Sequence, residues 1–162
     1  MTDELTIRAA AQGDIGPLTM IMQECMQHYF GTGAGGAQAA QALLGAGARS
    51  VETVVAFVGE EAVGFATFAV VYPGPEGRGT LYMKDLFVSG NARSRNLGRR
   101  LMAHLGGVAA ARGCIRFDWT AETSNPRALA FYDRIGAARV EEKVYFRLEG
   151  ARLQAFIAEG AE

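Results

Sequence analysis

Apolar residues recur at helical spacing in three long stretches of the chain, each bounded by residues that start or stop helices. The first stretch begins at Asp14, a residue type favoured at the N-cap, and the second ends at Gly113. The third opens with Asn125 and Pro126, because asparagine caps a helix and proline suits its first turn. With two shorter stretches added, helices are predicted at about 14–29, 38–47, 97–112, 125–135 and 151–160.

A period of two residues, rich in β-branched and aromatic side chains, marks the predicted strands. The order of elements indicates an α/β fold, with a central mixed, mostly antiparallel sheet of about six to seven strands flanked by helices. The strand, helix and strand over 80–120 form one parallel crossover, expected to be right-handed. We find no repeat or linker, so residues 1–162 are expected to form a single domain. Strands are predicted at 5–10, 50–58, 62–72, 80–89 and 114–122, and a hairpin at 138–150.

The composition excludes several classes of protein. Hydrophobic residues make up 49% of the chain and charged residues 20%, which is typical of a globular protein and not of a disordered one. No apolar run approaches the roughly 20 residues that span a bilayer, and the first residues lack the pattern of a secretory signal. Cys25 and Cys114 stand in apolar segments without metal-ligand spacing. We therefore expect free thiols, a cytoplasmic location, no metal site and no membrane partner.

Although the net charge is only −1, positive charge is concentrated in one turn, "RSRNLGRRLM", where a predicted strand is followed by a helix. A helix N-terminus binds anions through its free N–H groups and its dipole, and the preceding loop can wrap a phosphate. Arg93, Ser94 and Arg95 supply cations and a small polar group, and Gly98 and Arg99 follow in the first helical turn. By itself the pattern fits either an anion site or a solvated basic helix start. The nearly neutral chain argues against a nucleic-acid surface, and neither a Walker loop nor a dinucleotide fingerprint is present.

Two motifs in this half of the chain resemble signatures of the GNAT family of N-acetyltransferases. "VSGNARSRNLGRRLM" is similar to the acetyl-CoA pyrophosphate loop, Arg/Gln-x-x-Gly-x-Gly/Ala, except that Asn96 replaces the first glycine. "NPRALAFYDRIGA" is similar to the second signature, Asn-x-x-Ala-x-x-Phe-Tyr-x-x-x-Gly-Ala/Phe. Asparagine tolerates left-handed backbone better than most residues, which suits the position of Asn96. The resemblance covers about residues 5–150 and looks nearest to the diamine and thialysine acetyltransferase branch.

The resemblance implies the GNAT fold, acetyl-CoA as cosubstrate and no metal. The loop arginines would meet the pyrophosphate, and backbone N–H groups at a strand bulge near Phe87 and Val88 would stabilise the oxyanion. Asn125 would contact the pantetheine arm as well as capping its helix, and Phe131 would pack beside the cosubstrate. The residues implied to bind acetyl-CoA are Phe87, Val88, Arg93, Ser94, Arg95, Asn96, Leu97, Gly98, Arg99, Asn125 and Phe131.

Two residues are candidates for proton transfer. Tyr132 matches the family's general acid, and a phenol with a pKa near 10 can protonate a departing thiolate. A tyrosine on an amphipathic helix is more often a core residue, and it is the surrounding motif that favours the catalytic role. Asp85, near a strand end, fits a general base and a structural partner of a neighbouring arginine equally well.

The acceptor side is less marked in the sequence. In the diamine and thialysine branch an acidic residue commonly stands at the position of Lys84, and a cation there would repel a cationic substrate by about 1 to 4 kcal/mol. Either Lys84 points away, or the substrate carries a carboxylate, as an amino acid does. Glu122 stands at a strand end near the expected cleft, and His28 ends the first helix as a candidate substrate contact. Trp119 fits either the acceptor cleft or the core.

The leading hypothesis is an N-acetyltransferase that transfers acetyl from acetyl-CoA to a primary amine of a small molecule, such as an amino acid or polyamine. One alternative is acetylation of a protein N-terminus or lysine, and another is a non-catalytic acyl-CoA-binding module, against which Tyr132 argues. Members of the family often form homodimers, some of them through C-terminal strands. The segment "KVYFRL" is apolar enough for such a strand, so a homodimer is a further expectation.

Overall fold

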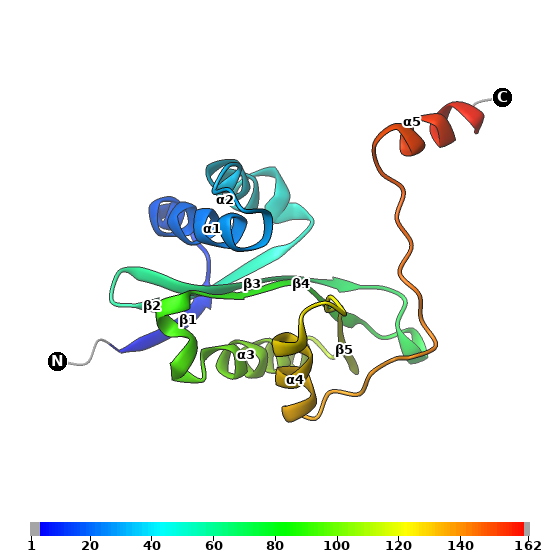
Figure 1. Cartoon of the computed structure of the whole chain (residues 1–162). Coiled ribbons are helices and arrows are strands. Elements are labelled where there is room, and N and C mark those ends of the chain that lie inside the picture. Colours follow the sequence, from blue (N-terminus) through cyan, green and yellow to red (C-terminus); the bar gives the residue numbers. More distant parts are fainter. Residues whose placement is uncertain (1–3, 161–162) are drawn as a thin grey trace. The chain divides into compact units, whose positions relative to one another are not determined.

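One sheet of five strands, joined in chain order, organises the first of the two compact units into which the chain divides, residues 1–121 (Figure 1). Its strands are β1 (Leu5–Ala9), β2 (Glu52–Val58), β3 (Glu61–Val71), β4 (Thr80–Val88) and β5 (Arg116–Trp119). The computed structural model describes residues 4–160, and only the backbone of residues 94 and 95. Neighbouring strands are antiparallel except β4 and β5, which are parallel. The predicted mixed, mostly antiparallel α/β sheet is confirmed, with fewer strands than expected in the described chain.

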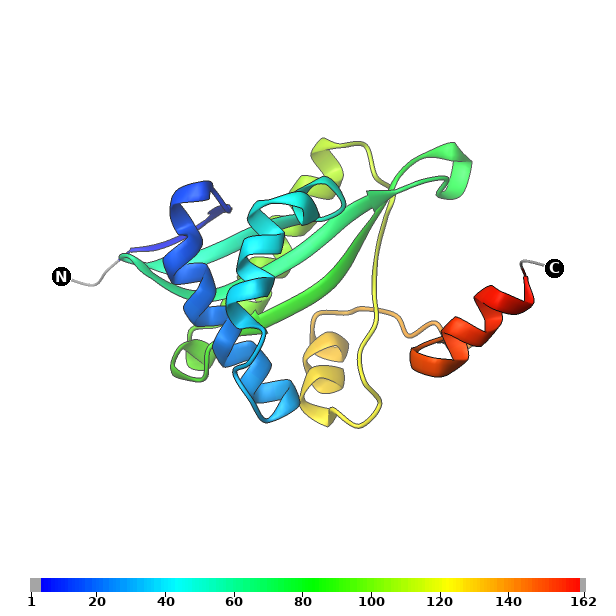
Figure 2. The same cartoon turned by 90° about the horizontal axis from the view of Figure 1, so that it is seen from above.

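Helices cover both faces of this sheet. Two of them, α1 (Ile15–Phe30) and α2 (Gly36–Leu44), lie together on one face, and α3 (Leu97–Ala111) lies on the other (Figures 1 and 2). The helix α3 connects β4 to the parallel strand β5, as the predicted crossover requires. Short 3-10 turns complete the unit: η1 (Gln12–Asp14), η2 (Ala46–Arg49), η3 (Pro75–Gly77) and η4 (Gly90–Arg95).

The core follows the apolar faces of these helices. On one side of the sheet, Leu18 and Ile21 of α1 pack in a cluster with Phe65 and Phe87. On the other side, a Cβ atom at Gly64 of β3 would lie 3.2 Å from side-chain atoms of Leu97 and of Leu101, so α3 sits directly on the strand. Each fully buried leucine contributes about 1.5 to 3 kcal/mol to the free energy of folding. Helices packed on both faces therefore stabilise the sheet.

The start of α1 differs from its predicted capping. Asp14 occupies the N-cap position, but its side chain makes no hydrogen bond to the helix. Instead its carboxylate accepts the Ala11 N–H at 2.7 Å and two guanidinium N–H groups of Arg8 at 2.7 and 2.8 Å. Asp14 therefore ties β1 to the turn before α1 rather than capping α1.

The second unit, residues 122–162, contains α4 (Pro126–Arg134) and α5 (Gly150–Glu159). The predicted start of α4 is confirmed, because the Asn125 side chain accepts the Ala128 N–H at 3.1 Å. The hairpin predicted at 138–150 is wrong: residues 138–149 form no strand, and their side chains are exposed, Phe146 at 87%. A hairpin is stable only when another layer covers its apolar face, and here Val144 and Phe146 remain exposed to solvent.

Candidate active site

The arginine-rich turn connects β4 to the N-terminus of α3. Asn96 adopts the left-handed conformation, with φ 56° and ψ 23°, and so makes the turn that a glycine makes in the motif it resembles. Leu97, exposed by 1%, anchors the first turn of α3 in the core, and the Arg100 N–H bonds to the Asn96 carbonyl at 3.2 Å. The first N–H groups of α3 have no partner within the helix, so they are suited to bind an anion.

Cationic side chains surround this helix start. Arg93 and Arg99 are exposed, and Gly98 between them is half-buried. The Arg93 Nε–H donates to the Val88 carbonyl at 3.3 Å, which holds this side chain against the end of β4. The side chains of Ser94 and Arg95 lie outside the described part of the structure. The turn thus combines backbone donors with positive charge, the combination that binds phosphate.

A β-bulge interrupts β4 at Lys84. Thr67 of β3 pairs with Asp85, but the next residue, Phe68, pairs with Met83, so Lys84 is the extra residue. The bulge expected near Phe87 and Val88 is therefore wrongly placed, since those two residues pair in regular register with β3. Lys84 and Asp85 point to the same side, with Lys84 Nζ 3.4 Å from Asp85 Oδ1.

Beyond the bulge, the outer edge of β4 is open. The parallel pairing with β5 ends where Met83 meets Trp119, and no strand within residues 4–160 pairs with the β4 edge after that point. The Ser89 N–H bonds to the Val63 carbonyl at 3.0 Å, and in an antiparallel pair every second residue repeats this direction. Phe87 therefore faces β3, whereas the backbone groups of Leu86 and Val88 face the open edge. Of the two N–H groups expected there as donors, that of Val88 faces the open edge and that of Phe87 does not, whereas the Leu86 N–H does.

The end of α1 lies over the bulge and carries several polar groups. Asp85 Oδ2 accepts the hydroxyl of buried Thr67 at 2.6 Å. The His28 ring lies 5.9 Å from the Phe87 ring, centroid to centroid. Burial, and next the charge of Asp85, raise the pKa of the Cys25 thiol to about 12, so Cys25 is a protonated thiol and no nucleophile.

Tyr29 lies between the bulge and the arginine turn. Its ring lies 6.3 Å from the Phe87 ring, and half of the residue is exposed. Burial raises the pKa of the Tyr29 phenol, and the charge of Asp85 raises it further, while Arg93 acts in the opposite direction. Because Asp85 and Arg93 both act on Tyr29, the carboxylate at the bulge and the cation of the arginine turn lie in one electrostatic environment.

Trp119 borders the same region from the neighbouring strand. It pairs with Met83, one residue before the bulge, and its ring packs edge-on against Phe117 at 5.0 Å. Trp119 is half-buried, which suits a residue that lines a site at the point where β4 and β5 cease to pair.

The remaining expected residues lie in the second unit. Phe131 and Tyr132 are half-buried neighbours on α4, with ring centroids 5.1 Å apart. Asn125 uses its side-chain oxygen as the helix cap, and Glu122 is exposed. The predicted site residues thus form two groups. His28, Lys84, Trp119 and the arginine turn lie in the first unit, whereas Glu122 lies in the second unit with the expected proton donor and its neighbours.

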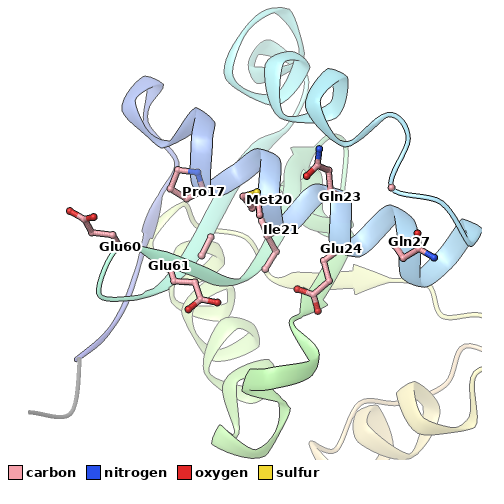
Figure 3. A pocket seen from close by; sticks show the side chains of 10 residues that line it. Pro17, Met20, Ile21, Gln23, Glu24, Gln27, Glu60 and Glu61 are labelled. Carbon is pink, nitrogen blue, oxygen red and sulfur yellow. The ribbon is translucent and has the colours of Figure 1, made fainter.

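An open pocket of about 830 Å³ lies on α1 beside the turn between β2 and β3 (Figure 3). None of the residues expected at the site from the sequence lines it. Its charged lining consists of Glu24, Glu60 and Glu61, so its chemistry differs from that of the cationic turn. The candidate site therefore comprises the bulge, the open edge of β4 and the arginine turn.

Residues 4–160 contain neither a metal-binding cluster nor a membrane-spanning helix. No three or more His, Cys, Asp and Glu side chains within this range gather closely enough to hold a metal ion. Within the same range, no helix is both long and apolar enough to cross a membrane.

Three residues of this region were not expected from the sequence. Thr67 contacts Asp85 across the strand pair, Tyr29 lies over Phe87, and Glu24 of α1 bonds to Ser89 and Gly90 at the start of the arginine turn. The sequence holds one local sign of Glu24: it is an acidic residue within the otherwise uncharged run "MIMQECMQ". Thr67 and Tyr29 carry no local signal, because their patterns fit a strand and a helix face.

The comparisons with known proteins agree with this geometry. The model of the acetyltransferase (GNAT) family matches residues 18–137. A thialysine N-epsilon-acetyltransferase of Caenorhabditis elegans is 31% identical over 114 residues, which cover 68% of this chain and 71% of that protein. An integron cassette protein from the mobile metagenome of V. cholerae has a TM-score of 0.86 at 36% identity, over 94% of this chain and 97% of that one. An aminoglycoside N-acetyltransferase solved in complex with CoA shares the fold, with a TM-score of 0.71 at 16% identity over 91% and 96% of the two chains.

The family model covers most of the chain and spans both motifs, the arginine turn and the segment from Asn125 to Ala137. The resemblance seen in the sequence is thereby confirmed. The chain belongs to the GNAT family and is an acetyl-CoA-dependent N-acetyltransferase.

Proposed function

We propose that the protein transfers the acetyl group of acetyl-CoA to the primary amine of a small molecule, with no metal. The open edge of β4, which leads directly into the arginine turn, is the observation that carries the proposal. An exposed strand edge pairs with an extended chain of amides, and the turn binds phosphates. Acetyl-CoA joins an amide-containing arm to a pyrophosphate, and when bound it supplies the acetyl thioester that the amine attacks.

Each candidate residue has a role in this proposal. Arg93, Arg99 and the N-terminus of α3 hold the pyrophosphate, together with the other residues of the turn. The backbone N–H groups of Leu86 and Val88 donate along the open edge, and one of them polarises the thioester oxygen. In the second unit, Asn125 and Phe131 line the arm.

Asp85 and Tyr132 are the residues proposed to transfer protons. The hydroxyl of Thr67 orients the Asp85 carboxylate, which takes the amine proton directly or through water. Tyr132 protonates the departing thiolate. The proposal treats residues 1–162 as one catalytic domain, since the family model at 18–137 crosses the boundary between the two units.

The acceptor is proposed to be a small amine that also carries a carboxylate. The similar protein from Caenorhabditis elegans is named for thialysine, which supports a small-molecule acceptor. Lys84 is exposed at the bulge and is only 3.4 Å from the Asp85 carboxylate, so it can exchange that partner for a substrate carboxylate. His28, Trp119 and Glu122 are the other proposed substrate contacts.

Calorimetric titration of CoA, followed by a thiol-release assay on a panel of amines, tests the function. Lysine and cadaverine form the sharpest pair in the panel, because they differ by one carboxylate. We expect micromolar CoA binding, turnover of a small amine, and a lower KM for lysine than for cadaverine. Turnover of peptides alone would support a protein acceptor, binding without turnover would support a non-catalytic acyl-CoA module, and no binding would refute the proposal.

We also propose a homodimer and a cytoplasmic location. The exposed apolar side chains of residues 138–149 support the homodimer, because a second copy would bury them. The two half-buried cysteines are free, which suits a reducing compartment.

A further inference from the structure

A single carboxylate oxygen connects α1 to Ser89 and Gly90, the residues that lead from β4 into the arginine turn. Glu24 Oε1 accepts the Ser89 hydroxyl at 3.0 Å and the Gly90 N–H at 2.9 Å. In Figure 3 the Glu24 side chain leaves α1 toward the green segment that follows β4. The two bonds join residues 65 and 66 positions apart in the chain, so they bring together elements that the sequence separates widely.

The contacted residues form the junction between β4 and η4. Ser89 is exposed by only 4%, and its backbone N–H bonds to the Val63 carbonyl at 3.0 Å. Its own carbonyl accepts the Ala92 N–H at 3.0 Å, which closes the first turn of η4. Ser89 is thus bonded to β3 by its N–H, to η4 by its carbonyl and to α1 by its hydroxyl.

We infer that Glu24 is a positioning residue of the acetyl-CoA site, which fixes the start of the phosphate-binding turn from α1. The inference rests on the proposed function of that turn. A short 3-10 turn has few internal bonds and poorer bond geometry than an α-helix, so its direction depends on bonds at its ends. By accepting the first N–H of η4, Glu24 acts on this turn as a capping residue acts on a helix.

The charge and the hydrogen bonds of Glu24 have opposite effects on anion binding. A carboxylate beside the turn repels a phosphate, whereas its bonds to Ser89 and Gly90 hold the turn in shape. Glutamine keeps an acceptor oxygen at the same place and removes the charge, and alanine removes both. The two variants therefore separate positioning from electrostatics.

The same helix carries His28 and Tyr29 over the bulge, so Glu24 also links the acceptor side of the site to the turn.

The experiment compares Glu24→Ala, Glu24→Gln and the control Glu61→Ala. Glu61 lines the same pocket from β3, and in the described chain it is not bonded to the turn. We expect Glu24→Ala to raise the calorimetric Kd of CoA about tenfold and the KM for acetyl-CoA in parallel, with the KM for the amine unchanged. The Kd and KM of Glu24→Gln should remain within about twofold of the wild-type values. Those of Glu61→Ala should equal the wild-type values.

Amide hydrogen exchange at Gly90 is measured on the same variants without CoA. Faster exchange in Glu24→Ala, restored in Glu24→Gln, is the result that a positioning role requires. Unchanged exchange and unchanged CoA affinity in Glu24→Ala would overturn the inference, as would a raised amine KM in Glu24→Gln, which would make Glu24 a substrate contact. If the wild type fails to bind CoA, both the proposed function and the role of Glu24 in CoA binding are refuted. The exchange at Gly90 still decides whether Glu24 holds the turn in its conformation.

Discussion

At the residue scale, the candidate proton-transfer groups have different surroundings. Asp85 is bonded by the buried hydroxyl of Thr67 on one oxygen and lies near Lys84 on the other. Tyr132 is half-buried beside the ring of Phe131. The bond from Thr67 fixes the orientation of the Asp85 carboxylate, as a general base requires, and a partly buried phenol is suited to give a proton to a thiolate.

Replacement of Tyr132 by phenylalanine should separate binding from chemistry. The ring and its packing are retained, and the hydroxyl that would protonate the thiolate is lost. We expect the Kd of CoA to stay within twofold and kcat to fall by about a hundredfold. Calorimetry and thiol release measure the two quantities, and an unchanged kcat would remove Tyr132 from the role of general acid.

Replacement of Gly98 by glutamate should prevent CoA binding. The new carboxylate would stand in the first turn of α3, where it both fills space beside the turn and repels phosphate. We expect the Kd of CoA to rise roughly a hundredfold in calorimetry. Gly107→Glu, on the same helix at an exposed position with nothing within 4 Å of a Cβ atom, is the control and should bind normally. Normal binding by Gly98→Glu would show that the phosphate site lies elsewhere.

At the scale of elements, ion pairing fixes β1 to the turn before α1. The Arg8 guanidinium lowers the pKa of Asp14 below its usual range, and the Ala11 N–H acts in the same direction. A carboxyl whose pKa is lower in the folded state stabilises the fold above its unfolded pKa of about 3.9. That contribution is lost as the pH falls through the lower pKa of the folded state.

Asp14→Asn should therefore destabilise the protein in a pH-dependent manner. We expect the free energy of unfolding at pH 7, measured in urea, to fall by about 1 to 2 kcal/mol. The loss is modest because about half of the Arg8 side chain is exposed, so that water screens the ion pair. The difference from the wild type should shrink below about pH 4. Asp133→Asn, which breaks the exposed pair with Arg139, is the control and should change the stability little. A difference that persists at low pH would mean that Asp14 acts without its charge.

The contact between α1 and α2 depends on a residue without a side chain. A Cβ atom at Gly36 would lie 2.7 Å from the Gln23 backbone nitrogen and 2.8 Å from its Cα, so α2 would have to move. We expect Gly36→Ala to lower the free energy of unfolding by about 1 to 3 kcal/mol. Gly106→Ala, in α3 with nothing within 4 Å, should instead stabilise the protein by about 0.5 to 1 kcal/mol. Equal effects of the two changes in thermal unfolding would contradict this packing.

At the scale of the whole molecule, the C-terminal segment is unusual in its exposure. Val144, Tyr145 and Phe146 are 72, 69 and 87% exposed, and Phe156 and Ile157 of α5 are more than half exposed. Contiguous apolar side chains of this kind are normally covered in solution. The proposed second copy would cover them.

Phe146→Asp should shift the proposed homodimer toward monomer. Burial of an aspartate in an apolar interface is costly, so we expect the dimer Kd in analytical ultracentrifugation to rise at least about tenfold. The melting temperature should also lose its dependence on protein concentration. Phe30→Asp, at a side chain 72% exposed in the first unit, is the control. A wild type that is monomeric at all concentrations would refute the homodimer.

The parts of the site that were predictable are those built from neighbours in the chain. Asn125 and Pro126 start α4 through a bond across three residues, and the arginine turn is contiguous from Arg93 to Arg100. The position of the bulge was not predictable, because Lys84 becomes the extra residue only through the register of β4 against β3. For the same reason the sequence could not show that the N–H of Leu86, and not that of Phe87, faces the open edge.

The sequence by itself determined most of the helices and strands, the family and the positive charge of the arginine turn, because periodicity, capping and motif spacing are local properties. The tertiary structure decided which edge of β4 stays open, where the bulge lies and that Glu24 reaches Ser89 across 65 positions. It also decided that residues 138–149 form no hairpin within the described chain. These outcomes depend on which strand, helix or layer is adjacent in space, and such contacts between distant residues leave no pattern in the local sequence.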